Sequence, residues 1–314
     1  MTTSDFMMLF SECPNIETLG VPWAGSQTDQ VALGLYIGKM CSKLRHVQPS
    51  HIRDDYQLSV TITSTMAPNT LQGLSTYDYS LDVPSMSTIL ERHSPCLRIV
   101  KMEGYVHLTS ALIRQVLVHC SALEELRLNR FSAYTAALTL ADATAERWAS
   151  NRIKYLQLQE GEYFNRPEPL VLTDAEREQF ELLTKLYTQI GRQRMMEILD
   201  LVAVPEATSV KAKATGFVFP AFPAMLSLGT WGSGGCPGYL HLLRGLTRLR
   251  KLIGSFEMYS DETVLTVGQA EVEFMLQHWE RLENVHFYSR RVPFRPCFQY
   301  MQDERPNLSL YHYR

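Results

Sequence analysis

The sequence has no marked excess of charge of either sign, and it lacks long apolar runs. Its 30 lysines and arginines stand against 33 aspartates and glutamates, which gives a formal net charge of −3. Without a basic surplus to neutralise phosphates, nucleic-acid binding is not expected. No apolar run is long enough to cross a bilayer, and the N-terminal segment lacks the basic start of a signal peptide. We therefore expect a cytoplasmic or nuclear protein that binds neither nucleic acid nor membrane.

Cysteine is also sparse, and it is not arranged for metal binding. Six cysteines occur, and none forms a C-x-x-C pair or a zinc-ligand spacing with histidine. A chain without a secretory signal is expected in a reducing compartment, where cysteines remain thiols. The sequence therefore predicts neither a metal site nor disulfides.

Catalytic motifs are missing as well. The sequence has no G-x-S-x-G elbow, no H-E-x-x-H pair and no kinase signature. A glycine-rich stretch at residues 232–238 lacks the Gly-Lys-Ser/Thr ending of a phosphate-binding loop. The carboxylates of Glu124 and Glu125, like those of Asp54 and Asp55, are adjacent in sequence and so point in divergent directions. We expect no catalytic residue, no cofactor and no enzymatic activity.

What the sequence does contain is a repeated phrase. A small or apolar residue is followed by apolar residues three, six and usually eight positions later. The residue at the sixth position recurs mostly at intervals of roughly 24 to 33 residues, close to the period of a leucine-rich repeat. Good copies begin at Cys13, Cys41, Ser94, Cys120, Ser150 and Trp279, and weaker ones centre on Leu71/Leu74, Met196/Leu199/Leu201, Met225/Leu228, Leu249/Leu252 and Leu308/Tyr311/Tyr313.

The phrase predicts one strand and one helix in each repeat. Its last two apolar positions are two residues apart, which is the spacing of one face of a strand. Such a unit cannot bury its own apolar face, so neighbouring units must stack into a continuous core. Helical spacing of apolar residues precedes several copies, as in Val31-Leu35-Met40, Leu112-Val116-Leu117 and Val272-Met275-Leu276-Trp279.

The expected fold is therefore an α/β leucine-rich-repeat solenoid, with a parallel sheet on its concave face and helices on its convex face. We expect a single domain over residues 1–314, with about 11 irregular repeats. Insertions are expected near residues 159–193, where a polar loop leads into a helix opened by Thr173 and Asp174, and at the glycine-rich residues 231–238. Cys13, Cys41 and Cys120 share one repeat position, where a small residue suits the tight junction between helix and strand.

The Cys-x-x-Leu-x-x-Leu-x-Leu phrase, with a helix between copies, resembles the repeats of F-box proteins. Residues 242–252 and 278–285 are similar to the C-terminal repeats of the F-box-like proteins that are numerous in filamentous fungi. The resemblance implies a ribonuclease-inhibitor-like arc that holds the substrate of a Skp–cullin ubiquitin ligase. It also implies an N-terminal F-box, yet residues 6–10 lead directly into the first repeat without the Leu-Pro-x-Glu start of that domain. Skp and cullin are thus expected partners only if an F-box is supplied elsewhere.

Binding is expected on the strand residues that alternate with the core positions. Among these, Arg127, Tyr155, Trp231 and Tyr288 are the predicted anchors, because arginine and aromatic residues dominate protein interfaces. Two alternatives remain open, a repeat scaffold with no link to ubiquitin and an enzyme that uses residues 159–174 or 231–238 as a site. The full predicted set is Glu125, Arg127, Asn129, Tyr155, Gln157, Gln159, Ile198, Asp200, Val202, Trp231, Lys251, Asn284, His286 and Tyr288.

Overall fold

A computed structural model describes most of the chain. The described residues are 2–21, 26–49, 56–77, 83–103, 109–128, 138–160, 174–203, 225–229, 238–254, 268–288 and 296–313. Their contacts divide the chain into two compact units. Unit 1 comprises residues 1–136 and 148–150, and unit 2 comprises residues 137–147 and 151–314. That both belong to one domain stays a prediction.

Helices and strands alternate along unit 1. In chain order its elements are α1 (Thr3–Glu12), β1 (Thr18–Val21), α2 (Gln27–Met40), β2 (His46–Pro49), α3 (Tyr56–Thr65), β3 (Gly73–Tyr77), α4 (Val83–His93), η1 (Ser94–Cys96), β4 (Ile99–Glu103), α5 (Ser110–His119) and β5 (Glu125–Leu128). Serine and threonine side chains cap the helices, because their oxygens accept from the first free backbone N–H groups. Ser26 accepts from Asp29 N in this way, and Thr109 accepts from Leu112 N.

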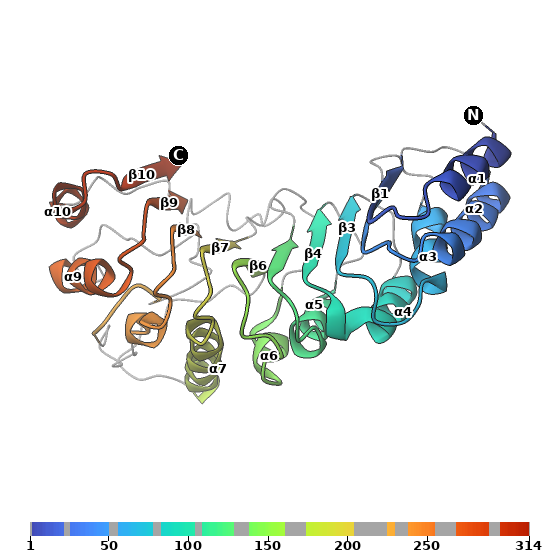
Figure 1. Ribbon diagram of the computed structural model, residues 1–314. Helices are drawn as coiled ribbons and strands as arrows, with labels where there is room; N and C mark the ends of the chain where they lie inside the picture. The colour runs from blue at the N-terminus through green and yellow to red at the C-terminus, as the bar shows by residue number, and fades with distance from the viewer. Residues whose placement is uncertain are drawn as a thin grey trace, which may run out of the picture. The chain divides into compact units, whose positions relative to one another are not determined.

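Unit 2 repeats the same alternation. Its elements are α6 (Leu140–Thr144), β6 (Tyr155–Glu160), α7 (Asp174–Gly191), β7 (Ile198–Ala203), η2 (Leu240–Leu243), β8 (Lys251–Gly254), α9 (Gln269–His278), β9 (Asn284–Tyr288), α10 (Pro296–Glu304) and β10 (Ser309–Tyr313). Within each unit the helices lie along one side of the row of strands (Figure 1). The helix predicted to open at Thr173 and Asp174 is confirmed as α7.

Every strand in a unit is parallel to the next, in chain order. In unit 1, Val100 of β4 lies opposite Leu126 of β5, and in unit 2, Leu199 of β7 lies opposite Leu252 of β8. An open α/β arrangement of parallel strands, each preceded by a helical segment, fits a leucine-rich-repeat-like solenoid. The repeat predicted around Leu228 is wrong, however. Because β7 pairs directly with β8, no strand lies between them.

The repeated leucines form the core of both units. In successive repeats the third position of the phrase is occupied by Leu44, Leu71, Leu97, Leu123, Ile153, Met196, Leu249, Leu282 and Leu308, all at most 3% exposed. The sixth position, such as Leu126 or Leu199, is equally buried. Burying an aliphatic side chain of this size contributes about 1.5–3 kcal/mol. Each repeat therefore adds one aliphatic layer that stacks on the layer before it.

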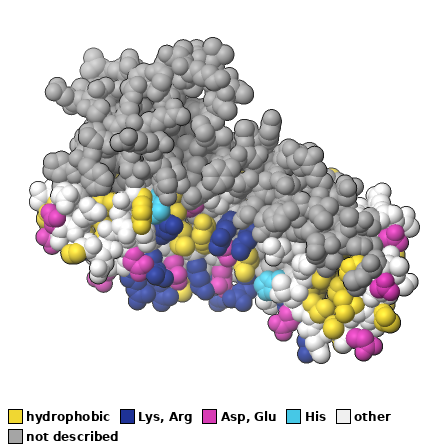
Figure 2. All heavy atoms as spheres, turned by 90° about the horizontal axis from the view of Figure 1, so that it is seen from above, with side chains coloured by type: hydrophobic (Ala, Val, Ile, Leu, Met, Phe, Trp, Pro, Cys, Tyr) yellow, Lys and Arg dark blue, Asp and Glu magenta, His cyan; other side chains and the backbone are white. Residues whose placement is uncertain are grey.

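A row of backbone hydrogen bonds ties the turns before the strands together. In unit 2, Glu197 N donates to Lys154 O, Arg250 N to Glu197 O and Glu283 N to Arg250 O, each at 2.8 Å. The corresponding row in unit 1 joins Glu17, Arg45, Gln72, Arg98 and Glu124. The side chains in these rows are largely charged. In unit 2 they alternate in sign, whereas in unit 1 the neutral Gln72 lies between Arg45 and Arg98. Lys and Arg side chains interspersed with acidic ones gather along one edge in Figure 2.

Helix α2 buries a different face from the one predicted. Its buried residues are Gln30, Leu33, Gly34 and Ile37, whereas Leu35 and Met40 are 40% and 43% exposed. The reason is the close approach of α3. A Cβ atom on Gly34 would lie 2.7 Å from Thr61 Cβ, so the small residue selects the contact face. The apolar faces predicted for α5 and α9 are confirmed, with Val116 and Met275 fully buried.

The last repeat is one residue shorter than the sequence pattern predicts. Leu310, not Tyr311, lies opposite the core residue Val285. Tyr311 instead lies opposite His286 and is 47% exposed. The predicted core role of Tyr311 is wrong, because the strand begins directly after Leu308 and its alternation shifts by one residue.

Two of the three aligned cysteines occupy the predicted tight junctions. Cys41 and Cys120 are 2% and 0% exposed at the ends of α2 and α5. Burial raises the pKa of the Cys120 thiol to about 12, so it stays protonated. The same expectation is wrong for Cys13, at the end of α1, which is exposed.

None of the helices in the described part of the chain combines the length and the apolar character that a bilayer crossing requires.

Candidate protein-interaction surfaces

The strand face is the side of each unit's strands that points away from the helices. Its residues alternate along each strand with the buried ones, such as Leu126 and Leu128 on β5. In unit 1 it carries an ion cluster in which Lys101 Nζ lies 3.4 Å from Glu125 Oε1 and Arg127 also pairs with Glu125. The three side chains are 18–36% exposed. The predicted residues Glu125 and Arg127 are thus brought together at a half-exposed, charged site.

The strand face of unit 2 is closed at its centre, in the sense that its side chains there are buried. Gln157 and Asp200, which lie opposite each other on β6 and β7, are only 6% and 0% exposed. Gln157 Nε2 donates to Asp200 Oδ2 at 3.0 Å, and Ile253 on β8 is also buried. Gln157 and Asp200 are therefore covered on this face, and their predicted role in binding a partner stays a prediction. A buried carboxylate needs such a donor, so the pair is a structural contact and not an open binding group.

The remaining predicted residues of unit 2 lie around this closed centre. Tyr155, Ile198, Lys251 and Asn284 are half-buried at the beginnings of β6 to β9. His286 is also half-buried, and its ring lies 4.5 Å from that of Tyr311 at an interplanar angle of 43°. This aromatic pair is a feature that the sequence prediction missed, because it placed Tyr311 in the core.

Several predicted positions lie outside the described residues. These are Asn129 and Trp231, together with the side chains of Gln159, Val202 and Tyr288. Most of the two predicted loops, residues 161–173 and 231–237, also lies outside them. The proposed enzyme alternative depends on these loops and stays untested.

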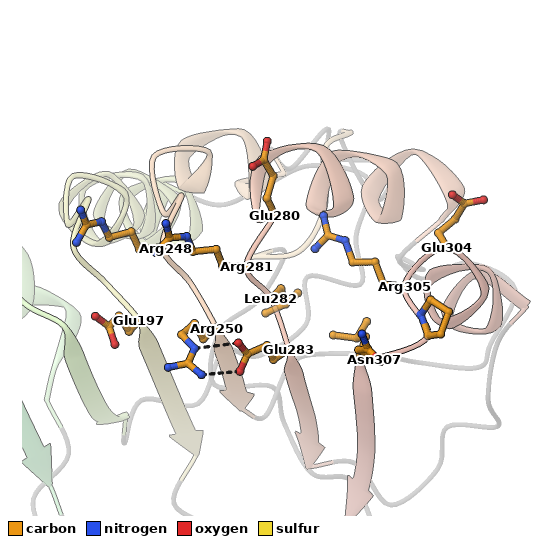
Figure 3. A pocket seen from close by; sticks show the side chains of 12 residues that line it. Glu197, Arg248, Arg250, Glu280, Arg281, Leu282, Glu283, Glu304, Arg305 and Asn307 are labelled. Atoms are coloured by element: carbon orange, nitrogen blue, oxygen red, sulfur yellow. Dashed lines mark hydrogen bonds and ion pairs between the residues drawn. The ribbon is translucent and has the colours of Figure 1, made fainter.

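A second surface, absent from the sequence prediction, lies where the turns of unit 2 lead into β8, β9 and β10 (Figure 3). It is a hollow of about 620 Å³ in which arginine and glutamate side chains predominate. Arg250 Nε and Nη2 donate to the two carboxylate oxygens of Glu283 at 3.0 and 2.9 Å. The hollow is lined by Glu197, Arg248, Arg250, Glu280, Arg281, Leu282, Glu283, Glu304, Arg305, Pro306, Asn307 and Leu308.

One arginine of this hollow is part of the scaffold. Arg305 Nη1 donates to Trp279 O at 2.7 Å, and its Nη2 donates to Leu276 O. These carbonyls belong to the C-terminal end of α9, whose partial negative charge a cation stabilises. Partial burial lowers the pKa of Arg305, but the guanidinium remains charged. Arg305 therefore fixes the wall of the hollow.

Two histidines of unit 1, His93 and His46, are packed against neighbouring residues. His93 is fully buried in unit 1, where its Nε2 lies 3.0 Å from Thr63 O and its Nδ1 accepts from Leu71 N at 3.5 Å. Burial lowers the pKa of His93, so the ring is neutral near pH 7. His46 is half-buried, because its ring packs directly over Gly73.

Among the residues that the structure describes, no group of three or more His, Cys, Asp or Glu side chains could hold a metal ion. No protein-family model matches the sequence, and none of the curated proteins matches it. Among solved structures, a chain from the crystal structure of the yeast Rad7 and Elc1 complex is similar, with a TM-score of 0.45 and 11% identity. The alignment covers 98% of this chain and 71% of that chain. Similarity at this level assigns no family to the chain.

Proposed function

We propose that this chain is a protein-interaction module that binds another protein on its strand face. The observation that carries the proposal is the ion cluster of Lys101, Glu125 and Arg127 on adjacent strands of unit 1. Its side chains are held in register by the parallel pairing of β4 and β5. Groups fixed on a rigid backbone bind with little loss of conformational freedom, which favours recognition of a partner surface.

The repeat architecture supports the same proposal. Solenoids curve because each repeat is rotated slightly against the next, and the strand side then becomes a concave surface that can hold a partner. We propose that the strand face is this concave surface. In unit 2 its contact residues are then the open ones, Tyr155, Lys251 and His286, rather than the buried pair of Gln157 and Asp200.

The resemblance to F-box repeat proteins makes the proposal more specific. In that form the module is a substrate receptor of a Skp–cullin ubiquitin ligase, acting in the cytoplasm or nucleus, with an F-box supplied outside the described repeats. It acts by binding and needs no cofactor. The absence of catalytic motifs in the sequence supports this.

The experiment is affinity capture from the host lysate, with quantitative mass spectrometry of the captured proteins. The bait is the wild-type chain or a strand-face variant in which Arg127, Tyr155, Lys251 and His286 are replaced by alanine. We expect a protein that the wild type captures and the variant loses. Skp and cullin subunits among the proteins captured by the wild type would support the ligase receptor.

A matched control removes four exposed side chains on the helix side, Lys39, Glu91, Lys185 and Glu273. The control variant should capture the same proteins as the wild type. If the strand-face variant captures every protein that the wild type captures, binding on the strand face is wrong. If a partner is lost only from the strand-face variant and no ligase subunit is captured, the module is a scaffold unrelated to ubiquitin.

A further inference from the structure

Four consecutive repeats of unit 2 present an arginine in the turn before the strand. Arg152, Arg248 and Arg281 each lie three residues before β6, β8 and β9, and Arg194 lies four residues before β7. All four are exposed, whereas the core residues that follow them, such as Ile153 and Leu249, are fully buried. The buried neighbours fix the backbone of each turn, so the arginines form an ordered row, which we call the arginine row.

Three of the four arginines are available to a ligand. Arg194, Arg248 and Arg281 form no ion pair with any other residue that the structure describes. Arg248 and Arg281 line the hollow of unit 2, and their side chains extend in the same direction (Figure 3). A guanidinium group presents a planar set of donors that matches a carboxylate, so two such groups in one hollow form an anion-binding surface.

The acidic residues of the hollow do not cancel this surface. Both oxygens of Glu283 are occupied by Arg250. Glu280 projects away from the strands and Glu304 lies on the side of α10, whereas Arg248 and Arg281 lie towards β7 (Figure 3). The charges are therefore separated within the hollow. On its β7 side Arg248 and Arg281 outnumber Glu197, and its α10 side is occupied by Glu304 and the anchored Arg305.

We propose that the arginine row binds an extended acidic segment of a partner protein. Neighbouring strands lie about 4.8 Å apart, so four repeats place the arginines over about 15 Å. An extended peptide rises about 3.3 Å per residue, and a segment of four or five residues spans the row. Aspartate and glutamate side chains on such a segment reach successive guanidinium groups.

The same surface is less suited to a nucleic acid. Glu197 and Glu283 lie in the adjacent row at the starts of the strands, where they would face a continuous phosphate backbone. The chain also carries a net charge of −3 and has no general cationic surplus to hold a long polyanion. A short carboxylate-bearing segment can engage the arginines and avoid the glutamates. The inference is independent of the proposed function, because the arginine row is separate from the strand face.

The test is fluorescence anisotropy with the full chain and a labelled peptide in which aspartate and glutamate alternate with glycine and serine. We expect binding that weakens strongly from low salt to about 0.3 M NaCl, because charge pairs are screened. Replacing Arg152, Arg194, Arg248 and Arg281 by glutamine should weaken binding by roughly tenfold or more. A peptide with lysine in place of the acids should not bind.

The control replaces Arg147 and Arg244 by glutamine, two exposed arginines of unit 2 outside the row. This variant should bind the acidic peptide as the wild type does, and circular dichroism should show every variant folded. Equal binding by the row variant and the wild type would overturn the proposal. So would a single-stranded oligonucleotide of equal charge that binds the wild type more tightly than the peptide, which would make nucleic acid the ligand.

Discussion

The two units share one repeat but differ at the turn that precedes each strand. In unit 2 the residues directly before the buried third position are Arg152, Met195, Arg248, Arg281 and Asn307, with Arg194 before Met195. In unit 1 they are Asn15, Lys43, Thr70, Cys96 and Ala122. The buried third position that follows is aliphatic or methionine in both units wherever it is fully buried. The core therefore specifies the backbone, and the exposed turns are free to carry a different surface in each unit.

On the strand face, in contrast, unit 1 has the more exposed charged groups. Unit 1 keeps charged groups half-exposed at Lys101, Glu125 and Arg127, whereas unit 2 buries the polar pair of Gln157 and Asp200. An ionised group tolerates burial only with partners, and in unit 1 Glu125 has them in Lys101 and Arg127. The comparison teaches that strand alternation alone does not identify a binding residue. What covers the strand decides whether its outward side chains reach a partner.

Removal of a core leucine should have the largest effect, and a similar one in both units. Leu97 and Leu249 are both 0% exposed at equivalent positions. Leu97→Ala and Leu249→Ala should each lower the free energy of unfolding by about 2–5 kcal/mol, because each leaves a cavity in the stacked core. Chemical denaturation measures the loss, and hydrogen exchange should place it in the mutated unit. A loss below about 1 kcal/mol in one unit would show that its repeats do not share the same core.

Removal of one charged side chain from the strand face should lower the free energy of unfolding more in unit 2 than in unit 1. Asp200→Ala leaves the buried Gln157 amide without its acceptor and should cost about 1–3 kcal/mol. Arg127→Ala in the half-exposed cluster of unit 1 should cost less than about 1 kcal/mol. Thermal and denaturant unfolding of the two variants checks the difference. Equal costs would contradict the closed character of the strand face in unit 2.

Acidification should lower the stability of unit 1 and leave that of unit 2 nearly unchanged. Burial lowers the pKa of His93, so the folded ring stays neutral while the unfolded chain takes up a proton near pH 6.5. The contribution of neutral His93 to stability is therefore fully present above the pKa of histidine in the unfolded chain. It falls as the pH drops from about 7.5 to about 5.5. Asp5 and Asp29 keep their charges in this window, because hydrogen bonds to Thr2 and Ser26 lower their pKa values.

Hydrogen exchange at the two pH values, corrected for intrinsic rates, measures the effect in each unit. Among the described side chains of unit 2 no histidine is buried, so its exchange should change little. His93→Gln should reduce the pH dependence of unit 1, and His46, whose pKa burial also lowers, should account for the remainder. An equal loss of protection in the two units would contradict the role of His93.

The ion pairs at the starts of the strands should have the smallest effects. Arg98 Nη2 lies 2.6 Å from Glu124 Oε1 in unit 1, and the Arg side chain is 49% exposed. A double-mutant cycle with Arg98→Gln and Glu124→Gln should give a coupling of about 0.2–1 kcal/mol that shrinks at high salt. A salt-insensitive coupling would mean that the pair is shielded from solvent.

The sequence predicts the repeat well and its surfaces poorly. Core leucines such as Leu97 and Leu126 recur at a nearly constant interval, so their period reveals strand, turn and helix together. Leu228 fits the phrase by chance and forms no repeat, because a phrase of three apolar residues carries no information on strand pairing. Tyr311 shows that one missing residue exchanges the two faces of a strand.

The arginine row could have been found in the sequence. Arg152, Arg248 and Arg281 share one position of the phrase, directly before the buried third residue. Strand alternation does not reveal the row, because the arginines lie before the strands. The burial of Asp200, in contrast, has no signal in the phrase, because it depends on tertiary contacts that the repeat period does not encode.

The most direct test of the interaction module is lysine cross-linking of the full chain in the host lysate, followed by mass spectrometry. Lys101 and Lys251 lie on the strand face, and the exposed Lys39 and Lys185 lie on the helices α2 and α7. Our account predicts that cross-links to a specific partner come from Lys101 and Lys251 and disappear when Arg127, Tyr155 and His286 are replaced by alanine. Partner cross-links that come only from Lys39 and Lys185 would contradict binding on the strand face.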